Sequence, residues 1–233
     1  MSKNNLIDLA KSINKDLKVE GGLQLVGAST ALDIERISVG SLTYDIVTGG
    51  GFAVGRHNYV FGPESSGKTT AALMALSNYF RGKDKRAAFF MDSEFAFDKK
   101  YAEGLGIDID RLFIYQPDNI EQGEIMLSKL ITENKIGIFV VDSIATLQPQ
   151  SVIDNGATAA NIGTHAKSLG NLYKTINSGV SKNSITGIWI NQIRDAIGGY
   201  GGGIANFGLA SMNNSTVFNN SAVGGKGANS TFG

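Results

Sequence analysis

The stretch "FGPESSGKTT", Phe61 to Thr70, decides the fold class of this 233-residue chain. Residues 62–69 fit the pattern G-x-x-x-x-G-K-[ST], in which the backbone N–H groups of a glycine-rich turn cradle phosphates. A short apolar strand is expected before it, in "HNYVF" (57–61), and an amphipathic helix after it, near 68–81. These flanks place the positive end of a helix behind the loop, as a phosphate site requires, whereas an incidental glycine turn needs no such context.

The loop combines a backbone cradle with two side chains that carry chemistry. Lys68 would reach the β- and γ-phosphates of a nucleotide, and the hydroxyl of Thr69 would take a place on Mg²⁺. The residues expected to bind the nucleotide are Gly62, Pro63, Glu64, Ser65, Ser66, Gly67, Lys68, Thr69 and Thr70.

Carboxylates close two of the other apolar runs. Asp142 ends "IGIFVVD" (136–142), where it fits the outer-sphere carboxylate of a Mg²⁺ site; the alternative is a turn residue or a helix cap. Asp92 and Glu94 follow the apolar run in "FFMDSE", and a carboxylate one strand away from the loop can orient and deprotonate an attacking water. Glu94 is the expected base, with a solvated surface glutamate as the alternative.

A neutral amide ends the last apolar run, in "WINQIR". The side-chain amide of Asn191 or Gln192 can hydrogen-bond a γ-phosphate without adding charge, so it could report whether that phosphate is present. Lys68 and Glu94, together with this amide, form the expected catalytic set.

Apolar runs and helical patterns alternate along the chain. Strands are expected at 57–61, 86–92, 112–117, 136–142 and 186–191, and helices near 68–81, 99–105, 119–134 and 162–180. Strands that are apolar throughout and alternate with helices predict an α/β fold, with a mostly parallel central sheet covered by helices on both faces. In such sheets ligands bind at the carboxyl ends of the strands, which is where the candidate residues lie.

Two segments flank this core. Residues 4–18 have the apolar spacing of an amphipathic helix and are followed by glycines, so residues 1–33 form a separate helical arm. The arm could fold back on its own domain or pack on a neighbouring subunit. Residues 34–197 are the expected core, and residues 198–233, rich in glycine and asparagine, have no strand or helix period and are expected to be loop or disordered.

The amino-acid composition excludes several classes of protein but does not indicate a function. The formal net charge is zero, so no global field favours an acidic partner. There is no cysteine, which excludes disulfides and thiolate metal sites. No apolar run approaches the roughly 18 residues that span a bilayer, so a cytoplasmic protein without membrane contacts is expected.

Four ordered motifs give the chain a resemblance to a known family. "GPESSGKTT", "MDSE" followed by Asp98 and Tyr101, "VVDS" and "INQIR" resemble the bacterial RecA recombinases in order and spacing, over roughly residues 34–200. A phage-encoded member fits this likeness. The resemblance implies a P-loop NTPase with a RecA-like core that uses ATP, polymerises into a helical filament on single-stranded DNA, pairs it with a homologous duplex and exchanges strands.

The resemblance also implies roles for individual residues. Glu94 corresponds to the catalytic glutamate and Gln192 to the γ-phosphate sensor, while Asp98 and Tyr101 correspond to the adenine contacts, with Tyr101 stacked on the base. The N-terminal helix corresponds to the one that docks on the adjacent protomer.

DNA binding in the family belongs to two loops that follow the strands ending at Asp142 and Asn191. In the first, Ile162 and Gly163 stand where the family has methionine and glycine, and Lys167 and Lys174 stand where it has arginines; both lysines could equally form a solvated helix face. The second begins at Arg194, and its end resembles the glycine pair Gly224 and Gly225.

The likeness ends there, because the family continues with further strands, interface lysines and a small C-terminal domain. The chain therefore resembles a C-terminally truncated member that supplies only the central strands, and strand exchange is more in doubt than nucleotide binding. Two other readings remain open. One is a RecA-fold helicase-type DNA motor, and the other is a non-hydrolysing nucleotide-binding regulator of a recombinase filament.

Overall fold

The structure is a computed structural model that describes residues 2–19, 22–29, 33–155, 163–192 and 215–218. The chain divides into two compact units, Met1–Glu35 and Arg36–Gly233, and each is described by itself. No helix among the described residues has the length and apolarity needed to cross a bilayer.

The N-terminal unit is built on the helix that the sequence predicted. Helix α1 spans Lys3–Asp16 and begins at the capping hydroxyl of Ser2, which accepts a hydrogen bond from the backbone N–H of Asn5. The chain then turns back, because the side chain of Asn14 donates to the carbonyl of Leu23 at 2.8 Å and accepts from its N–H at 2.7 Å. A 3₁₀ turn at Val26–Ala28 follows. The unit is thus a helix with its own returning segment.

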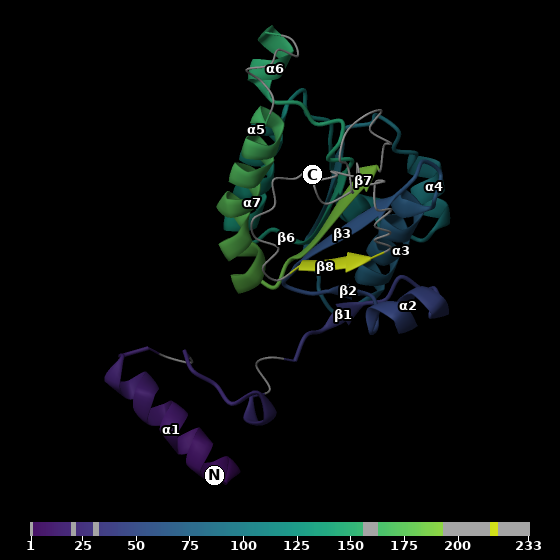
Figure 1. The fold of residues 1–233 in the computed structure, drawn as a ribbon. Coiled ribbons are helices and arrows are strands. Elements are labelled where there is room, and N and C mark those ends of the chain that lie inside the picture. Colours follow the sequence, from purple (N-terminus) through teal and green to yellow (C-terminus); the bar gives the residue numbers. More distant parts are fainter. Residues whose placement is uncertain (1, 20–21, 30–32, 156–162, 193–214, 219–233) are drawn as a thin grey trace, which may run out of the picture. The chain divides into compact units, whose positions relative to one another are not determined.

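The core unit contains a six-stranded sheet in the order β5-β4-β6-β7-β3-β8, and every pairing between its neighbours is parallel. The strands are β3 (His57–Gly62), β4 (Ala87–Asp92), β5 (Leu112–Tyr115), β6 (Ile136–Asp142), β7 (Thr186–Gln192) and β8 (Ser215–Phe218). The predicted α/β class and its parallel sheet are confirmed (Figure 1).

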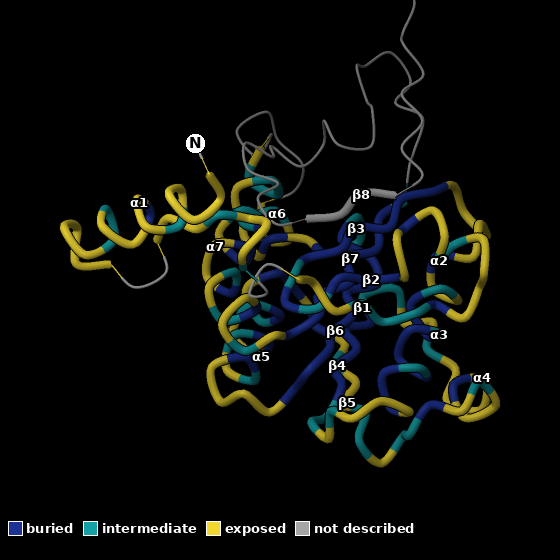
Figure 2. Tube along the Cα trace, turned by 90° about the horizontal axis from the view of Figure 1, so that it is seen from below, coloured by how far each residue is buried: buried dark blue, intermediate teal, exposed yellow. Residues whose placement is uncertain are grey.

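Helices cover both faces of the sheet, with α5 and α7 on one side and α3 and α4 on the other (Figure 1). Their bounds are Lys68–Arg81 for α3, Lys99–Gly104 for α4, Ile120–Thr132 for α5 and Thr164–Lys182 for α7. Along β6, Phe139 and Val141 pack towards α5 and α7, whereas Ile138 and Val140 pack towards α3. Burial on both faces explains why the central strands are apolar at nearly every position (Figure 2).

Some short elements were not predicted from the sequence. Strands β1 (Arg36–Ile37) and β2 (Phe52–Ala53) pair antiparallel, with helix α2 (Leu42–Thr48) between them. Gly51 makes this pairing possible, because its φ is +106° and an added Cβ would lie 2.1 Å from the carbonyl oxygen of Ile37. Helix α6 (Gln150–Asn155) is a further short element, after β6.

The glycine- and asparagine-rich tail contains a strand, so the expectation of loop throughout residues 198–233 is wrong for Ser215–Phe218. These residues form β8, paired parallel to β3 with His57 opposite Ser215 and Val60 opposite Phe218. The reason is a contact with a distant strand, because β3 has an edge that is available for pairing. A four-residue run that contains β-branched and aromatic residues can pair with this edge even though the residues next to the run in the sequence are polar. The chain therefore supplies more than the central strands.

A buried histidine lies where β3 begins, at the end of the strand opposite to the loop. The ring of His57 is fully buried among Phe139, Tyr173 and Trp189, and its Nδ1 accepts a hydrogen bond from Nε1 of Trp189 at 2.9 Å. The acceptor role of Nδ1 fixes the proton on Nε2, which has no hydrogen-bond partner among the described residues. Burial lowers the pKa of His57 to about 3.

This pKa predicts a pH-dependent stability. The pKa of His57 is 6.5 in the unfolded chain and about 3 in the folded chain. Below pH 6.5 the unfolded chain therefore binds a proton that the folded chain does not bind until about pH 3. The contribution of neutral His57 to the unfolding free energy is fully present above pH 6.5 and is lost as the pH falls below that value. We expect this group to remove about 1.5 kcal/mol of unfolding free energy between pH 6.5 and pH 5. Chemical denaturation at both pH values, followed by the fluorescence of Trp189, the only tryptophan, measures the change.

The control is His57→Leu, which abolishes the titration but leaves Nε1 of Trp189 without its acceptor. It should be less stable than the parent at neutral pH and show a smaller loss on acidification. An equal acid-induced loss in the two proteins would show that His57 does not cause it.

Candidate nucleotide-binding site

The parallel register brings the ends of four strands to one edge of the sheet. Gly62, at the end of β3, is paired with Gln192, at the end of β7, and Asp92, at the end of β4, is paired with Asp142, at the end of β6. Residues far apart in the sequence therefore meet where ligands bind in parallel sheets.

The loop after β3 is a tight turn that leads directly into α3. Ser65 and Gly67 have positive φ values of 58° and 83°, so successive peptide N–H groups can turn towards a common point. A Cβ at Gly62 would lie 2.5 Å from the hydroxyl oxygen of Ser66, so a larger residue there would displace the Ser66 hydroxyl. Lys68 begins α3, and its Nζ donates to the carbonyl of Pro63 at 2.6 Å. The ammonium group keeps further donors for a phosphate.

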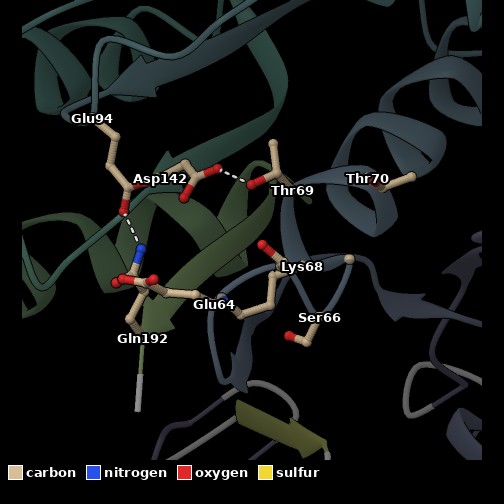
Figure 3. A pocket seen from close by; sticks show the side chains of 10 residues that line it. Glu64, Ser66, Lys68, Thr69, Thr70, Glu94, Asp142 and Gln192 are labelled. Carbon is tan, nitrogen blue, oxygen red and sulfur yellow. Dashed lines mark hydrogen bonds between the residues drawn. The ribbon is translucent and has the colours of Figure 1, made fainter. Parts of the chain in front are cut away.

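A cavity of about 450 Å³ opens in front of this loop (Figure 3). Its lining is mostly polar and comes from the loop, from the turn after β4, and from the ends of β6 and β7. The lining residues are Glu64, Ser65, Ser66, Gly67, Lys68, Thr69, Thr70, Glu94, Asp142 and Gln192. Most of the expected nucleotide-binding residues therefore line one cavity. Pro63 is not among the lining residues, but its carbonyl accepts the hydrogen bond from Lys68.

The donor set for a divalent cation consists of one hydroxyl and one carboxylate. Thr69 donates from Oγ1 to Oδ2 of Asp142 at 2.5 Å, which joins the loop to the end of β6. The described residues hold no cluster of three or more His, Cys, Asp or Glu side chains that could enclose a metal by themselves. Mg²⁺ fits such a site, because it is commonly held by one or two protein oxygens together with substrate phosphates.

Burial raises the pKa of Asp142 to about 6, and the negative charges of Glu94 and Asp92 act in the same direction. The hydrogen bond from Thr69 and the charge of Lys68 oppose this rise. The carboxylate of Asp142 therefore lies among groups that favour its protonated form, and a cation beside it would reverse that preference.

Glu94 and Gln192 meet across the cavity from the loop. Nε2 of Gln192 donates to Oε1 of Glu94 at 2.9 Å, as Figure 3 shows. The other amide atom, Oε1 of Gln192, is buried and has no hydrogen-bond partner among the described residues. A carboxylate and an amide that share one hydrogen bond are thus positioned opposite the glycine-rich loop.

Two expected adenine contacts are not part of the cavity lining. Asp98 caps helix α4, where its carboxylate accepts a hydrogen bond from the N–H of Tyr101 at 3.0 Å. The side chain of Tyr101 is half exposed.

The expected DNA-binding residues are only partly described. Lys167 and Lys174 are exposed on α7 and, seven residues apart, project from the same side of the helix, while Gly163 caps its start with a φ of 91°. The others, Ile162, Arg194, Gly224 and Gly225, lie outside the described residues. The structure also reveals two contributors that the sequence did not single out, Gln116 and Thr146. Their side chains contact Asp92 and Ser93, the two residues before Glu94. No spacing pattern marks such tertiary contacts.

The fold defines the class: a P-loop NTPase fold with a parallel sheet and a polar cavity at the carboxyl edge of that sheet. Within that class, the family model of the RecA N-terminal domain matches residues 5–206. The chain belongs to the RecA family.

Curated relatives agree with this assignment. The chain is 39% identical over 179 residues to Protein RecA of Nostoc punctiforme, covering 77% of this chain and 49% of the relative. It is 38% identical over 197 residues to Protein RecA of Streptococcus mutans, covering 84% and 51%, respectively. For Protein RecA of Synechocystis the identity is 35% over 204 residues, covering 85% and 57%. The chain thus spans about half the length of the curated relatives it matches.

The loop assignment predicts the effect of Lys68→Ala. Loss of the ammonium group that faces the phosphates should weaken ATP–Mg²⁺ binding roughly 10- to 100-fold, the cost of one hydrogen bond to a charged group. Titration calorimetry measures the affinity, and thermal unfolding checks that the variant is folded. Lys129→Ala, which removes an exposed lysine of α5, is the control and should bind like the parent. Unchanged affinity in Lys68→Ala would show that the loop does not bind the phosphates.

Proposed function

We propose that this chain is an ATP- and single-stranded-DNA-dependent recombinase, which forms nucleoprotein filaments for homologous pairing and strand exchange in DNA recombination and repair. The observation that carries the proposal is the meeting of Lys68, the Thr69–Asp142 pair and the Glu94–Gln192 pair around one cavity, in a chain of the RecA family.

ATP with Mg²⁺ is the ligand that this donor set fits. The N–H groups of the loop bind the β-phosphate, with the N-terminus of α3 behind them, and Lys68 binds the β- and γ-phosphates. The hydroxyl of Thr69 and the carboxylate of Asp142 would hold Mg²⁺, which supplies charge neutralisation between the phosphates. Asp98 and Tyr101 are proposed to contact the adenine.

Hydrolysis is proposed to depend on Glu94. Its carboxylate orients a water molecule and accepts its proton as the oxygen approaches the γ-phosphorus. The amide of Gln192 contacts the γ-phosphate and shares a hydrogen bond with Glu94. Because Gln192 lies two residues before Arg194, where the proposed second DNA loop begins, it links the phosphate site to that loop along the chain.

The proposed polymer partners are single-stranded DNA, a homologous duplex and further copies of this chain. Lys167 and Lys174, which are exposed on α7, would attract the DNA phosphates. The other proposed DNA contacts are Ile162 and Gly163, which precede α7 in the sequence, and Arg194, Gly224 and Gly225 in the second loop. The N-terminal helix α1 is proposed to dock on a neighbouring protomer, since apolar residues such as Leu9 and Leu17 remain exposed on it. A cytoplasmic location remains a prediction.

Glu94→Gln separates binding from hydrolysis. The amide keeps the shape of the side chain but cannot accept the proton, so ATP should bind as in the parent while turnover falls by about 10²-fold or more. Single-turnover ATP hydrolysis, with binding measured separately, tests this. Equal rates for variant and parent would remove Glu94 from the catalytic role, and tight ATP binding without turnover by the parent would favour the regulator instead.

Replacement of both Lys167 and Lys174 by alanine tests the DNA surface. The slope of log affinity for single-stranded DNA against log salt should decrease by roughly 1.4, about 0.7 for each lysine, and DNA-stimulated ATPase should fall with the affinity. The control replaces Lys129 and Lys135, which are exposed on and just after α5, and it should retain the parental slope. If the control pair changed the slope as much as Lys167 and Lys174, the assignment to α7 would be wrong.

A further inference from the structure

The turn after β4 carries Glu94. The last residue of β4, Asp92, is buried, and both of its carboxylate oxygens accept hydrogen bonds. Asp92 is 2% exposed. Its Oδ1 accepts from the N–H of Ala96 at 3.1 Å, and its Oδ2 accepts from the N–H of Phe97 at 3.1 Å and from Nε2 of Gln116 at 3.0 Å. The carboxylate thus closes the turn on the far side of Glu94 and connects it to the end of β5.

The next residue fixes the near side of the same turn. The N–H of Ser93 donates to the carbonyl of Asp142 at 2.8 Å, and its hydroxyl donates to the carbonyl of Ser143 at 2.7 Å. The hydroxyl of Thr146 lies 2.7 Å from that of Ser93 and 2.9 Å from the same carbonyl. Two hydroxyls and one carbonyl therefore form a closed group that connects the turn to the segment after β6.

Neither Asp92 nor Ser93 lines the cavity, and the same is true of Gln116 and Thr146. What they share is that their hydrogen bonds hold the segment on both sides of Glu94, at Ser93 before it and at Ala96 and Phe97 after it. The side chain of Glu94 itself lines the cavity. The carboxylate of Glu94 has one hydrogen bond from a side chain, the one from Gln192, so its direction depends on how its backbone is held.

We propose that Asp92 and Ser93 are positioning residues for Glu94, Asp92 by closing the turn and Ser93 by joining it to the Ser143–Thr146 segment. The proposal rests on the proposed function, in which Glu94 is the base. A general base must lie within hydrogen-bond reach of the water it activates, and a displacement of about 1 Å can cost about 10²-fold in rate.

The chemistry of the contacts explains the residue types. Asp92 accepts hydrogen bonds from three N–H donors, and both oxygens of a carboxylate can act as acceptors. An asparagine side chain has only one acceptor oxygen, and its NH₂ group would face at least one of those donors. Ser93 needs a hydroxyl that donates to a carbonyl while it contacts a second hydroxyl. Alanine at this position removes both contacts and leaves the volume nearly unchanged.

The test measures Asp92→Asn and Ser93→Ala in the parent and again in the Glu94→Gln background. In the parent, each change should lower kcat about 10- to 100-fold, with the KM for ATP and the affinity for ATP–Mg²⁺ unchanged. In the Glu94→Gln background the same changes should have no further effect on turnover, because the group that they position has already been removed.

Matched variants separate positioning from general destabilisation. Thr146→Val should behave as Ser93→Ala does, whereas Thr146→Ser, which keeps the hydroxyl, should retain parental turnover. Asp108→Asn is the control for Asp92→Asn, because Asp108 also accepts a backbone hydrogen bond at a turn, from Asp110, but lies outside the site. If Asp92→Asn does not fold, Gln116→Ala removes one of its three contacts from an exposed position and replaces it in the test.

The possible outcomes are distinct. Equal losses in the two backgrounds, or a loss of ATP affinity that parallels the loss of kcat, would overturn the positioning role and leave the proposed function intact. If Glu94→Gln itself hydrolyses ATP at the parental rate, the proposed role of Glu94 fails, and the positioning role fails with it.

Discussion

Parallel pairing of β4, β6, β7 and β3 is the constraint on which the rest of the structure depends. It brings the carboxyl ends of the strands to one edge, so that Asp92 meets Asp142 and Gly62 meets Gln192. Parallel strands of this kind require cover on both faces, which α3 and α4 supply on one side and α5 and α7 on the other. A shift of one residue in any pairing would turn its buried side chains to the opposite face and separate the site.

Much of this arrangement could be predicted from the sequence, because local patterns specify it. The apolar runs predicted the strands from β3 to β7, the helical patterns predicted α1, α3, α4, α5 and α7, and the motif at 62–69 predicted the loop. The expectation that residues after the strands meet at one edge follows from parallel pairing alone, and Glu94, Asp142 and Gln192 do line one cavity. Strand order and register, by contrast, are decided by packing between distant segments.

The features that could not be predicted are those for which the partner lies far away in the sequence. Strand β8 exists because β3 offers an edge, and β1 pairs with β2 because Gly51 admits a close approach to Ile37. The hydroxyl contact between Ser93 and Thr146 joins residues 53 positions apart. Serine and threonine are common in turns, so neither residue carries a signal of its own in the sequence.

The same geometry that assembles the site also opposes folding. Asp92, Glu94 and Asp142 bring three carboxylates together. Burial raises the pKa of Asp142 to about 6, and within the described part of the chain the charge of Lys68 opposes this rise. Above that pH the folded chain holds a carboxylate in surroundings that favour its protonated form, so ionisation of Asp142 costs stability there. A packing role alone would favour a neutral side chain at this position. An ionisable carboxylate at Asp142 is explained if it faces a divalent cation. Bound Mg²⁺ would offset the repulsion between the carboxylates and stabilise the folded state by mass action.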